Sequence, residues 1–308
     1  MTLINPPLLT HGGTHSARAF RMMIRDLARG SQGVTEGDDL RVSAATTPGA
    51  SVVVADGSAV VLGAQPAQGA YTQYNVGPAV VPIAPTGAAA RSDLIVLRVE
   101  DPEYEGTRLP DRDDIGYFHV VPNVPRTTTS APAGMTAVSL ARVDLPASTA
   151  VVTAAMVTDL RKVANPRLTR RLATASPLKD EVNKGGVGDW VDWPSVGKWA
   201  VAVPEWAVTA RIIVTLSGLQ VLGPVHAWAT FRLGTVEAQG VIVHDGAPSG
   251  DVRVQVIVAD TLTVPKALRG TTQTVQTMLM FKTTPGASVE ADTATTLICD
   301  VEFEEGVY

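Results

Sequence analysis

The feature that most constrains the fold of this chain is the alternation of side chains in its C-terminal third. Apolar residues recur at every second position in two runs: Val252, Val254, Val256 and Val258, and then Leu297, Cys299, Val301 and Phe303. Successive side chains of a strand point to opposite faces, so each run predicts a β-strand with one buried face. Four further strands are predicted at Arg211–Leu216, Ala227–Leu233, Val236–Val243 and Val275–Lys282. Short strands at this spacing predict an antiparallel β-sandwich, jelly-roll-like, over residues 189–308.

The region from Leu40 to Ala164 also has the pattern of short strands separated by Pro- and Gly-rich loops. Asp56-Gly57 lies between Ser51–Ala55 and Ala59–Leu62, which predicts a β-hairpin with a type I′ turn. Further strands are predicted at Ala79–Ile83, Leu94–Val99, Tyr117–Val121 and Ala137–Val143. The fold class is therefore mainly β, with a small β domain, a short connector and a C-terminal sandwich.

One helix is predicted before these strands, from Ala17 to Arg29, with Thr14 or Ser16 as N-cap and Gly30 as C-cap. Its apolar face comprises Ala17, Phe20, Ile24, Leu27 and Ala28. A second face carries an arginine stripe: Arg18, Arg21, Arg25 and Arg29. Such a stripe indicates either a solvated helix face or a docking surface for an acidic partner protein.

A basic joint, Thr153–Leu172, separates the two β-rich regions. The predicted segments are an extended arm (1–16), a β-rich domain with its helix (17–164), a connector (165–188) and the sandwich (189–308). Asn165-Pro166 is expected to end any helix that starts before it, and a short helix is expected over residues 166–172. Arg161 and Lys162 are expected to brace the first domain. A second basic set is expected to be free to contact an acidic neighbour: Arg167, Arg170 and Arg171.

Composition argues against several classes of protein. The net charge of −5 argues against a nucleic-acid partner, because such affinity comes from neutralising phosphates. Cys299 is the one cysteine, so no intrachain disulfide can form. The sequence MTLINPPLLTHGG lacks the features of a signal peptide, and no run approaches the roughly 20 apolar residues that span a bilayer. We therefore expect a protein made in a cytoplasm and not embedded in a membrane.

No motif predicts catalysis, a cofactor or a metal. His11 and His15 lie four apart but have two glycines and no glutamate between them, unlike a zinc-protease helix. The acidic loop Glu100–Asp114 matches no EF-hand, so a solvated loop is favoured over a Ca²⁺ site. The alternative of an enzyme that acts on cell-wall carbohydrate needs two facing carboxylates. Only Asp189, Asp192 and Glu205, near tryptophans, are candidates.

All five tryptophans lie between residues 190 and 228, at the start of the predicted sandwich. Indole rings stack on sugar rings when exposed, and they also fill cores and subunit interfaces. The candidates for glycan binding are Trp190, Trp193 and Trp206. Trp228 lies within a predicted strand and is expected to be buried.

Three sequence features together carry a family resemblance. They are the helix Ala17–Met23 followed by Gly30–Val34, the strand pair Ser51–Val61, and the segment Val157–Arg161 with the sequence Val-Thr-Asp-Leu-Arg. In this order and spacing, residues 15–165 resemble the minor tail proteins of long-tailed phages that infect actinobacteria, and are similar to baseplate upper-type proteins.

The resemblance implies a non-enzymatic virion protein of the tail tip, assembled in the host cytoplasm. It implies that the N-terminal domain attaches to other tail-tip proteins and that the C-terminal domain faces the host and binds a surface glycan or forms a structural knob. It also implies a homo-oligomer, most often a trimer. The chain has no long coiled coil or repeated shaft, which favours a compact tail-tip component over a fibre.

Overall fold

The computed structural model describes residues 11, 15–47, 49–183, 187–246, 250–282 and 288–308. The chain folds into two compact units, unit 1 (Met1–Pro166 with Val307–Tyr308) and unit 2 (Arg167–Gly306). The main chain therefore passes between the units twice. Of the predicted extended arm, residues 1–10 and 12–14 lie outside the described residues.

Unit 1 begins with helix α1 (Ala17–Leu27). Its start confirms the predicted cap, because Ser16 Oγ accepts a hydrogen bond from the Ala19 amide at 3.2 Å. The helix ends two residues earlier than predicted. Arg29 (φ 53°) and Gly30 (φ 69°) both adopt left-handed conformations, so Arg29 as well as the glycine turns the chain out of the helix.

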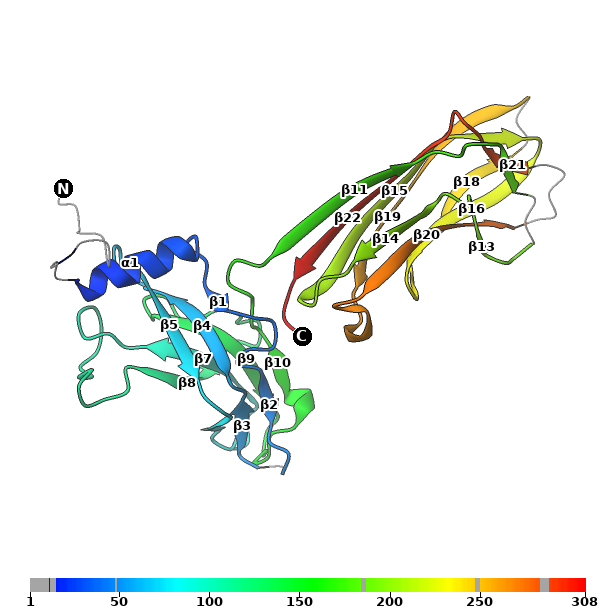
Figure 1. Cartoon of the computed structure of the whole chain (residues 1–308). Coiled ribbons are helices and arrows are strands. Elements are labelled where there is room, and N and C mark those ends of the chain that lie inside the picture. The colour runs from blue at the N-terminus through cyan, green and yellow to red at the C-terminus, as the bar shows by residue number, and fades with distance from the viewer. Residues whose placement is uncertain (1–10, 12–14, 48, 184–186, 247–249, 283–287) are drawn as a thin grey trace. The chain divides into compact units, whose positions relative to one another are not determined.

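The predicted apolar face of α1 is only partly covered, because Phe20, Ile24 and Ala28 are half-buried and Ala17 and Leu27 are exposed. Leu27 is 72% exposed, whereas Ala19 and Arg21 are the buried residues of the helix. The helix packs on strand β5 (Ala70–Asn75; Figure 1), where Gly69 leaves no room for a side chain. A Cβ on Gly69 would lie 2.6 Å from the carbonyl carbon of Arg21. The close contact between Gly69 and the Arg21 backbone, together with the polar partners of the Arg21 side chain, determines which face of the helix is buried. The periodicity of the apolar residues does not determine it.

The strands of unit 1 form three antiparallel sheets, of order β1-β4-β5, β2-β3-β6 and β10-β9-β7-β8 (Figure 1). The remaining elements that the structure describes in this unit are β1 (Gly33–Val34), β2 (Val42–Ala44), β3 (Ser51–Val54), β4 (Gly57–Leu62), β6 (Ala79–Pro82), β7 (Arg91–Val99), β8 (Gly116–Val124), β9 (Ala137–Leu145), the 3-10 helix η1 (Ala154–Met156) and β10 (Val157–Asp159). The four strands predicted between residues 79 and 143 are thus confirmed as β6 to β9.

The predicted hairpin at Asp56-Gly57 does not form. Strand β3 pairs with β2 and β6, whereas β4 pairs with β1 and β5, so the dipeptide carries the chain from one sheet to another. Gly57 has φ 133°, and a Cβ there would lie 2.5–2.7 Å from atoms of Asp39. A glycine is therefore required where the chain passes from one sheet to the other. The Asp-Gly dipeptide gives the same sequence signal for such a connection and for a hairpin.

The segment Val157–Arg161 closes unit 1. Strand β10 pairs with β9, and the Arg161 side chain that follows is fully buried. Its guanidinium donates to both carboxylate oxygens of Asp159, to the carbonyl of Asp39 at 2.6 Å and to the carbonyl of Tyr308 at 3.3 Å. Arg161 therefore fixes three separate segments of this unit.

Unit 2 is a two-layer sandwich of antiparallel strands. Its described elements are β11 (Leu168–Ala175), β12 (Glu181–Asn183), β13 (Val191–Asp192), β14 (Lys198–Ala202), β15 (Ala207–Leu222), β16 (Val225–Leu233), β17 (Val236–Glu237), β18 (Val241–Gly246), β19 (Val252–Thr263), the 3-10 helix η2 (Lys266–Leu268), β20 (Thr272–Phe281), β21 (Ser288–Ala291) and β22 (Thr296–Glu305). The longer strands have the order β11-β22-β15-β19 in one sheet, here the first sheet, and β14-β20-β16-β18 in the other, the second sheet. This interleaving of chain order between two sheets is a jelly roll, so the predicted class is confirmed.

The core of unit 2 lies between the two sheets. The alternation seen in the sequence sets which side chains enter it, since Val256, Val258, Leu297 and Phe303 are all buried there. Cys299 is buried in the same row, as its alternation predicts.

The predicted connector, residues 165–188, is instead largely part of the sandwich. Strand β11 pairs with β22 over eight residue pairs, from Leu168 opposite Glu304 to Ala175 opposite Leu297. The short helix expected over residues 166–172 is therefore absent from the described chain. In an extended conformation this backbone forms hydrogen bonds along the whole of its pairing with β22. A single helical turn would form fewer hydrogen bonds, so the strand is favoured over the short helix.

Candidate functional site

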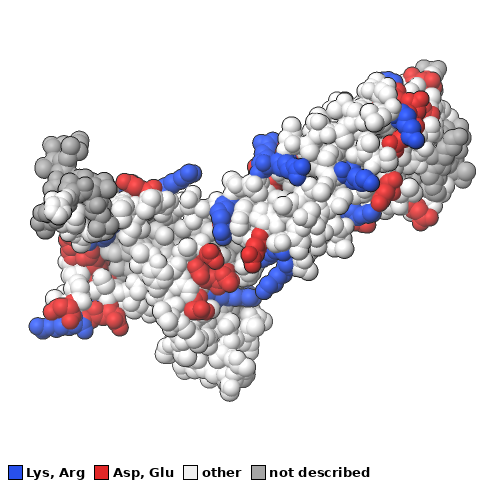
Figure 2. All heavy atoms as spheres, viewed as in Figure 1, with Lys and Arg blue, Asp and Glu red and all other residues white. Residues whose placement is uncertain are grey.

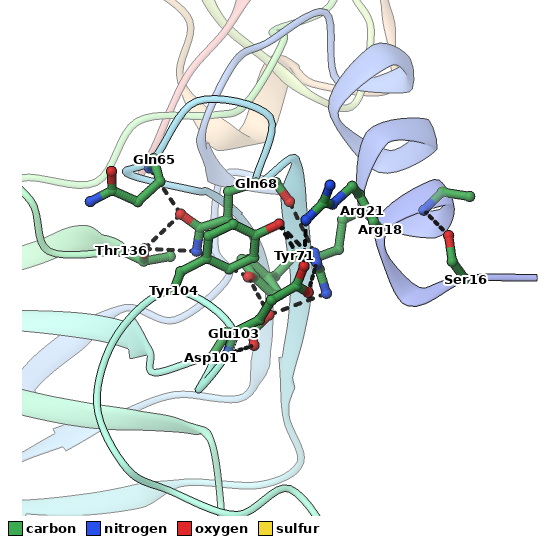
Figure 3. A network of polar contacts seen from close by, with 11 residues as sticks. Ser16, Arg18, Arg21, Gln65, Gln68, Tyr71, Asp101, Glu103, Tyr104 and Thr136 are labelled. Atoms are coloured by element: carbon green, nitrogen blue, oxygen red, sulfur yellow. Dashed lines mark hydrogen bonds and ion pairs between the residues drawn. The ribbon is translucent and has the colours of Figure 1, made fainter. Parts of the chain in front are cut away.

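Arg21 lies at the centre of a polar network inside unit 1 (Figure 3). Its Nε donates to the Gln68 carbonyl at 2.9 Å, and Nη2 donates to Glu103 at 2.5 Å and to the Tyr104 hydroxyl at 3.2 Å. Nη1 lies 3.2 Å from Asp101. The planar guanidinium thus meets acceptors along several edges, as a buried arginine must.

The network continues behind Asp101. The Tyr71 hydroxyl donates to Asp101 at 2.7 Å and accepts from the Gln68 amide at 3.0 Å. That amide also reaches Thr136, and its oxygen accepts from the Gln65 backbone at 2.9 Å. Burial raises the pKa of Tyr71, so its hydroxyl keeps its proton. These contacts tie α1, β5 and the acidic loop together.

The four arginines of the predicted docking stripe divide in two. Arg21 is buried, so its assignment to partner docking is wrong. Arg18 is half-exposed and donates to Glu103 at 2.6 Å. Hydrogen bonds from Arg21 and Arg18 lower the pKa of Glu103. Arg25 and Arg29 are exposed, and in the part of the chain that the structure describes neither makes an ion pair, so for them docking stays a prediction.

The acidic loop supplies partners for the helix and for its own strands. Glu100 accepts a hydrogen bond from the Tyr117 hydroxyl at 2.8 Å, which lowers the pKa of Glu100, and it lies 3.5 Å from Arg108. Among the described residues, no cluster of three His, Cys, Asp or Glu side chains could hold a metal ion. The carboxylates that were expected to be solvated are largely neutralised within the unit.

The second basic set is not free either. Arg170, on β11, forms a bidentate pair with Asp300 on β22 and lowers the pKa of that carboxyl. Arg171 donates to the carbonyl of Ala200 at 2.8 Å. The prediction that these side chains await an acidic neighbour is wrong, because strand pairing places acceptors from remote parts of the chain beside them.

Arg167 and Trp206 share one environment. Arg167 binds Glu305 through its side chain and also donates its backbone amide to that carboxylate at 2.9 Å. Its guanidinium carbon lies 5.5 Å from the centre of the Trp206 ring, which also packs against the core. Arg167 is therefore not free for a partner, and Trp206 is occupied by contacts within unit 2.

Trp193 belongs to the core. It is 7% exposed, and its backbone exchanges hydrogen bonds with Thr277 at 3.0 and 2.9 Å. The assignment of Trp193 to glycan binding is wrong, because the indole faces other core residues.

Two other tryptophans meet at the surface of unit 2. Trp190 and Trp228 are both half-buried, which corrects the expectation that Trp228 is buried. A Cβ on Gly240 would lie 3.0 and 3.1 Å from Trp190 and 3.5 Å from Trp228, so both indoles contact this glycine. Ile242, which is 49% exposed, lies opposite Trp228 on the adjacent strand. We call the four residues Trp190, Trp228, Gly240 and Ile242 the aromatic platform.

Polar groups border the aromatic platform. The Trp228 indole N–H donates to His226 Nε2 at 3.2 Å, and His226 Nδ1 lies 3.7 Å from Asp245. This arrangement places the imidazole proton on Nδ1 and fixes the tilt of the indole. Lys282 Nζ lies 5.0 Å from the Trp228 ring, in the range of a cation–π contact. An apolar plane beside donors and acceptors suits a ligand with one apolar face and polar edges.

Two of the candidate carboxylates for the enzyme alternative, Asp192 and Glu205, lie far apart. Asp192 is opposite Met278 in β20, whereas Glu205 follows β14, whose last residue is opposite Thr272. Six residues of strand span about 20 Å, well beyond the roughly 5–10 Å that separates the two carboxyl groups of a glycosidase. Asp189 is exposed.

On the face of the molecule drawn in Figure 2, basic and acidic side chains lie interspersed in small groups. This mixture follows from the ion pairs described above. In the described part of the chain, no helix is long and apolar enough to cross a membrane.

No protein-family model matches the chain, and no curated protein does. Similar solved structures include the infectious bursal disease virus VP2 subviral particle (13% identity, TM-score 0.26, covering 90% of this chain and 75% of that chain). The T13 particle of the same virus has 13% identity and a TM-score of 0.24, with 89% and 76% covered. The delta-endotoxin Cry8Ea1 from Bacillus thuringiensis has 8% identity and a TM-score of 0.24, with 90% and 52% covered. These TM-scores are below those of a shared overall fold, so the assignment of the jelly roll rests on the strand order of unit 2.

Proposed function

We propose that this protein is a non-enzymatic structural component of a phage tail tip. In this proposal, unit 1 attaches to neighbouring tail proteins and unit 2 presents the aromatic platform to a glycan of the host surface. The motifs that resemble minor tail proteins, over residues 15–165, fall within unit 1, which ends its main segment at Pro166. The resemblance therefore stops where the compact unit stops, which supports separate roles for the two units.

The observation that carries the proposal for unit 2 is the geometry of the aromatic platform. Two indoles from separate segments meet at Gly240, where no side chain interrupts the apolar surface. Pyranose rings have apolar C–H faces and hydroxyl edges, so they can stack on indole while their hydroxyls bond to neighbouring polar groups. His226, Asp245 and Lys282 are placed at the border of the platform to make such bonds.

The support for unit 1 as the attachment unit comes from how its motif residues are used. Arg161 joins three segments of the unit, and Arg21 fixes α1 to its sheet and the acidic loop. In this unit Arg25, on α1, and Arg29, two residues after its end, are both exposed. These are the two side chains that we propose for contact with an acidic tail protein.

Glycan binding is tested by titrating the full-length protein with polysaccharide extracted from actinobacterial cell envelopes. Trp190→Ala and Trp228→Ala should each weaken binding roughly tenfold or more, in line with the loss of a central aromatic contact. Tyr74→Ala is the matched control, because Tyr74 is an exposed aromatic residue of unit 1. Binding that survives both tryptophan substitutions unchanged would show that the platform is not the site.

The virion role is tested separately by antibody labelling of purified particles. Epitopes on unit 2 should be labelled at the tail tip of intact particles, while epitopes around α1 should become accessible only after the tail is dissociated. Absence of the protein from purified particles would refute the proposal.

A further inference from the structure

Two methionines on the outer face of the second sheet are buried. Met278 and Met280 alternate along β20 with core residues such as Leu279, so their side chains point away from the core. They are nevertheless only 1% and 7% exposed. Trp190 directly precedes β13, on one side of β20, yet its ring contacts Gly240, which directly precedes β18, two strands away on the other side. The indole therefore crosses this face of the sheet and shields the methionines from water.

The ion pair of Asp192 and Arg232 lies on the same face. Asp192 is opposite Met278 in β20, and side chains that are opposite in paired strands share a face. Arg232 is four positions after Trp228 on β16, so alternation places both on one face. Arg232 Nη2 donates to Asp192 at 2.7 Å, and the two side chains are 33% and 50% exposed. The pair thus presents a carboxylate acceptor and guanidinium donors side by side to a ligand.

The groups of this face follow one line along β16. His226 and Arg232, at the two ends of the line, are six residues apart, which is about 20 Å in a strand. Asp245 and Lys282 accompany His226, because one is opposite it in β18 and the other donates its backbone amide to the His226 carbonyl. The two indoles lie between the ends. We call this line the outer track, which comprises Trp190, Asp192, His226, Trp228, Arg232, Asp245 and Lys282.

The outer track has no excess of positive charge. Its cations are Arg232 and Lys282, and its anions are Asp192 and Asp245. Glu237 is exposed and opposite Arg232 in β17, so it adds a third carboxylate beside the track. Among the described residues, two positive and three negative charges leave a net of −1. This balance favours an uncharged ligand over a polyanionic one.

The length of the outer track exceeds that of a single sugar. A sugar stacked on the indoles can reach the polar groups of one end only, whereas a chain of several sugars can reach both ends. Each hydroxyl of a sugar can donate and accept, so neighbouring hydroxyls match a carboxylate and a guanidinium that lie side by side. Asp192 and Arg232 therefore suit the hydroxyl edge of a sugar beyond the one on the indoles.

We infer that the outer track binds a linear, uncharged oligosaccharide that runs along β16, with Asp192 and Arg232 as its second polar subsite. This inference rests on the proposed function, because it starts from glycan stacking on the aromatic platform. It adds the class of glycan, the direction of the chain and two residues that select for its length.

The test is titration of the full-length protein with fragments of increasing length, prepared by partial hydrolysis of the neutral fraction of the envelope polysaccharide. Affinity should rise roughly tenfold or more between the shortest fragment that binds and those that reach both ends, and then level off. Arg232→Met should remove most of this gain and leave the affinity for the shortest fragment unchanged, because the indoles remain. Asp192→Asn, which keeps the size of the side chain, should act in the same direction.

Two controls accompany these variants. Arg211→Met is the matched substitution, because Arg211 is an exposed, ion-paired arginine on the first sheet, and it should bind every fragment like the wild type. Unchanged urea unfolding followed by tryptophan fluorescence would establish that each variant folds. The affinity of the wild type should also stay constant as NaCl is raised to about 0.5 M, because an uncharged ligand has no counterions to release.

The outcomes separate this inference from the proposed function. If the wild type binds no fragment, glycan recognition by the platform is refuted, and the inference with it. Three results would overturn the inference alone: equal affinity at every length, equal effects of Arg232→Met and Arg211→Met, and an affinity that falls steeply with salt.

Discussion

Replacement of Arg21 by methionine should destabilise unit 1 and leave unit 2 unchanged. Arg21 is 8% exposed and contacts Asp101, Glu103, the Gln68 carbonyl and the Tyr104 hydroxyl. Methionine keeps much of the apolar stem but supplies no donor. The substitution therefore removes the charge while it preserves most of the packing against β5.

The magnitude follows from what each partner loses. Removal of one member of a buried ion pair typically costs about 3–5 kcal/mol. Asp101 keeps its hydrogen bonds from the Tyr71 hydroxyl and the Glu103 amide, so the free-energy loss at Asp101 is at the lower end of this range. The side chain of Glu103 is 43% exposed and can be rehydrated, so its share is below about 1 kcal/mol. With about 1 kcal/mol for the Gln68 carbonyl, these contributions give an expected loss of about 4–5 kcal/mol.

Two probes separate the units. All five tryptophans belong to unit 2, so their fluorescence follows that unit alone, whereas calorimetry follows both. For a unit of this size, a loss of about 4–5 kcal/mol corresponds to a fall of roughly 8–20 °C in the midpoint of the calorimetric transition of unit 1, which tryptophan fluorescence does not report. Arg18→Met is the matched control, because Arg18 binds the same Glu103 from a half-exposed position and should cost less than about 1 kcal/mol. Equal effects of the two substitutions, or a shift of the tryptophan transition, would refute the reasoning.

The same variant should change the response to acid. The hydrogen bonds from Arg21 and then Arg18 hold the pKa of Glu103 below its ordinary 4.5. A depressed pKa contributes stability that is present above pH 4.5 and is lost as the pH falls through the folded-state value. Arg21→Met should therefore flatten the acid dependence of unit 1, measured by calorimetry between neutral pH and the acid limb.

Three further predictions concern unit 2. Burial raises the pKa of Cys299 to about 12, so a thiol reagent should label it only as unit 2 unfolds, and rapid labelling of the native protein would contradict its burial. The hydrogen bond from Arg253 lowers the pKa of Asp292 from 3.8 to about 2, so its contribution to stability is complete above pH 3.8 and is lost toward pH 2. Asp292→Asn should remove that acid dependence from urea unfolding followed by tryptophan fluorescence, and a parallel acid profile would show that the pair is not responsible. Gly240→Ala places a Cβ 3.0 and 3.1 Å from the Trp190 ring and should shift its emission and weaken saccharide binding, whereas identical spectra and affinity would show that the glycine is not needed.

The sequence by itself determined the features that depend on neighbours along the chain. Alternation at Val256–Val258 and Leu297–Phe303 fixed which side chains enter the core, because the direction of a side chain reverses at every residue of a strand. Ser16 predicted the start of α1, because a cap acts within one turn. The jelly-roll-like class followed from the number and spacing of these strands.

Tertiary structure alone decided which residues became partners. Arg18 meets Glu103 across 85 positions and Arg170 meets Asp300 across 130, and no local pattern specifies such a pair. The sequence indicates no partner for either arginine, because the acceptors are remote in the chain and come within hydrogen-bonding distance only in the folded structure.

The aromatic platform has the same origin. The local sequence of Trp193 suggested exposure as strongly as that of Trp190, and Trp206 was a further candidate for glycan binding. Packing buried Trp193 and placed Arg167 over Trp206. Trp228 became the partner of Trp190 because the fold placed both indoles beside Gly240. Exposure is set by the summed packing of distant segments, which local spacing does not encode, so the fold class could be predicted from the sequence and the site could not.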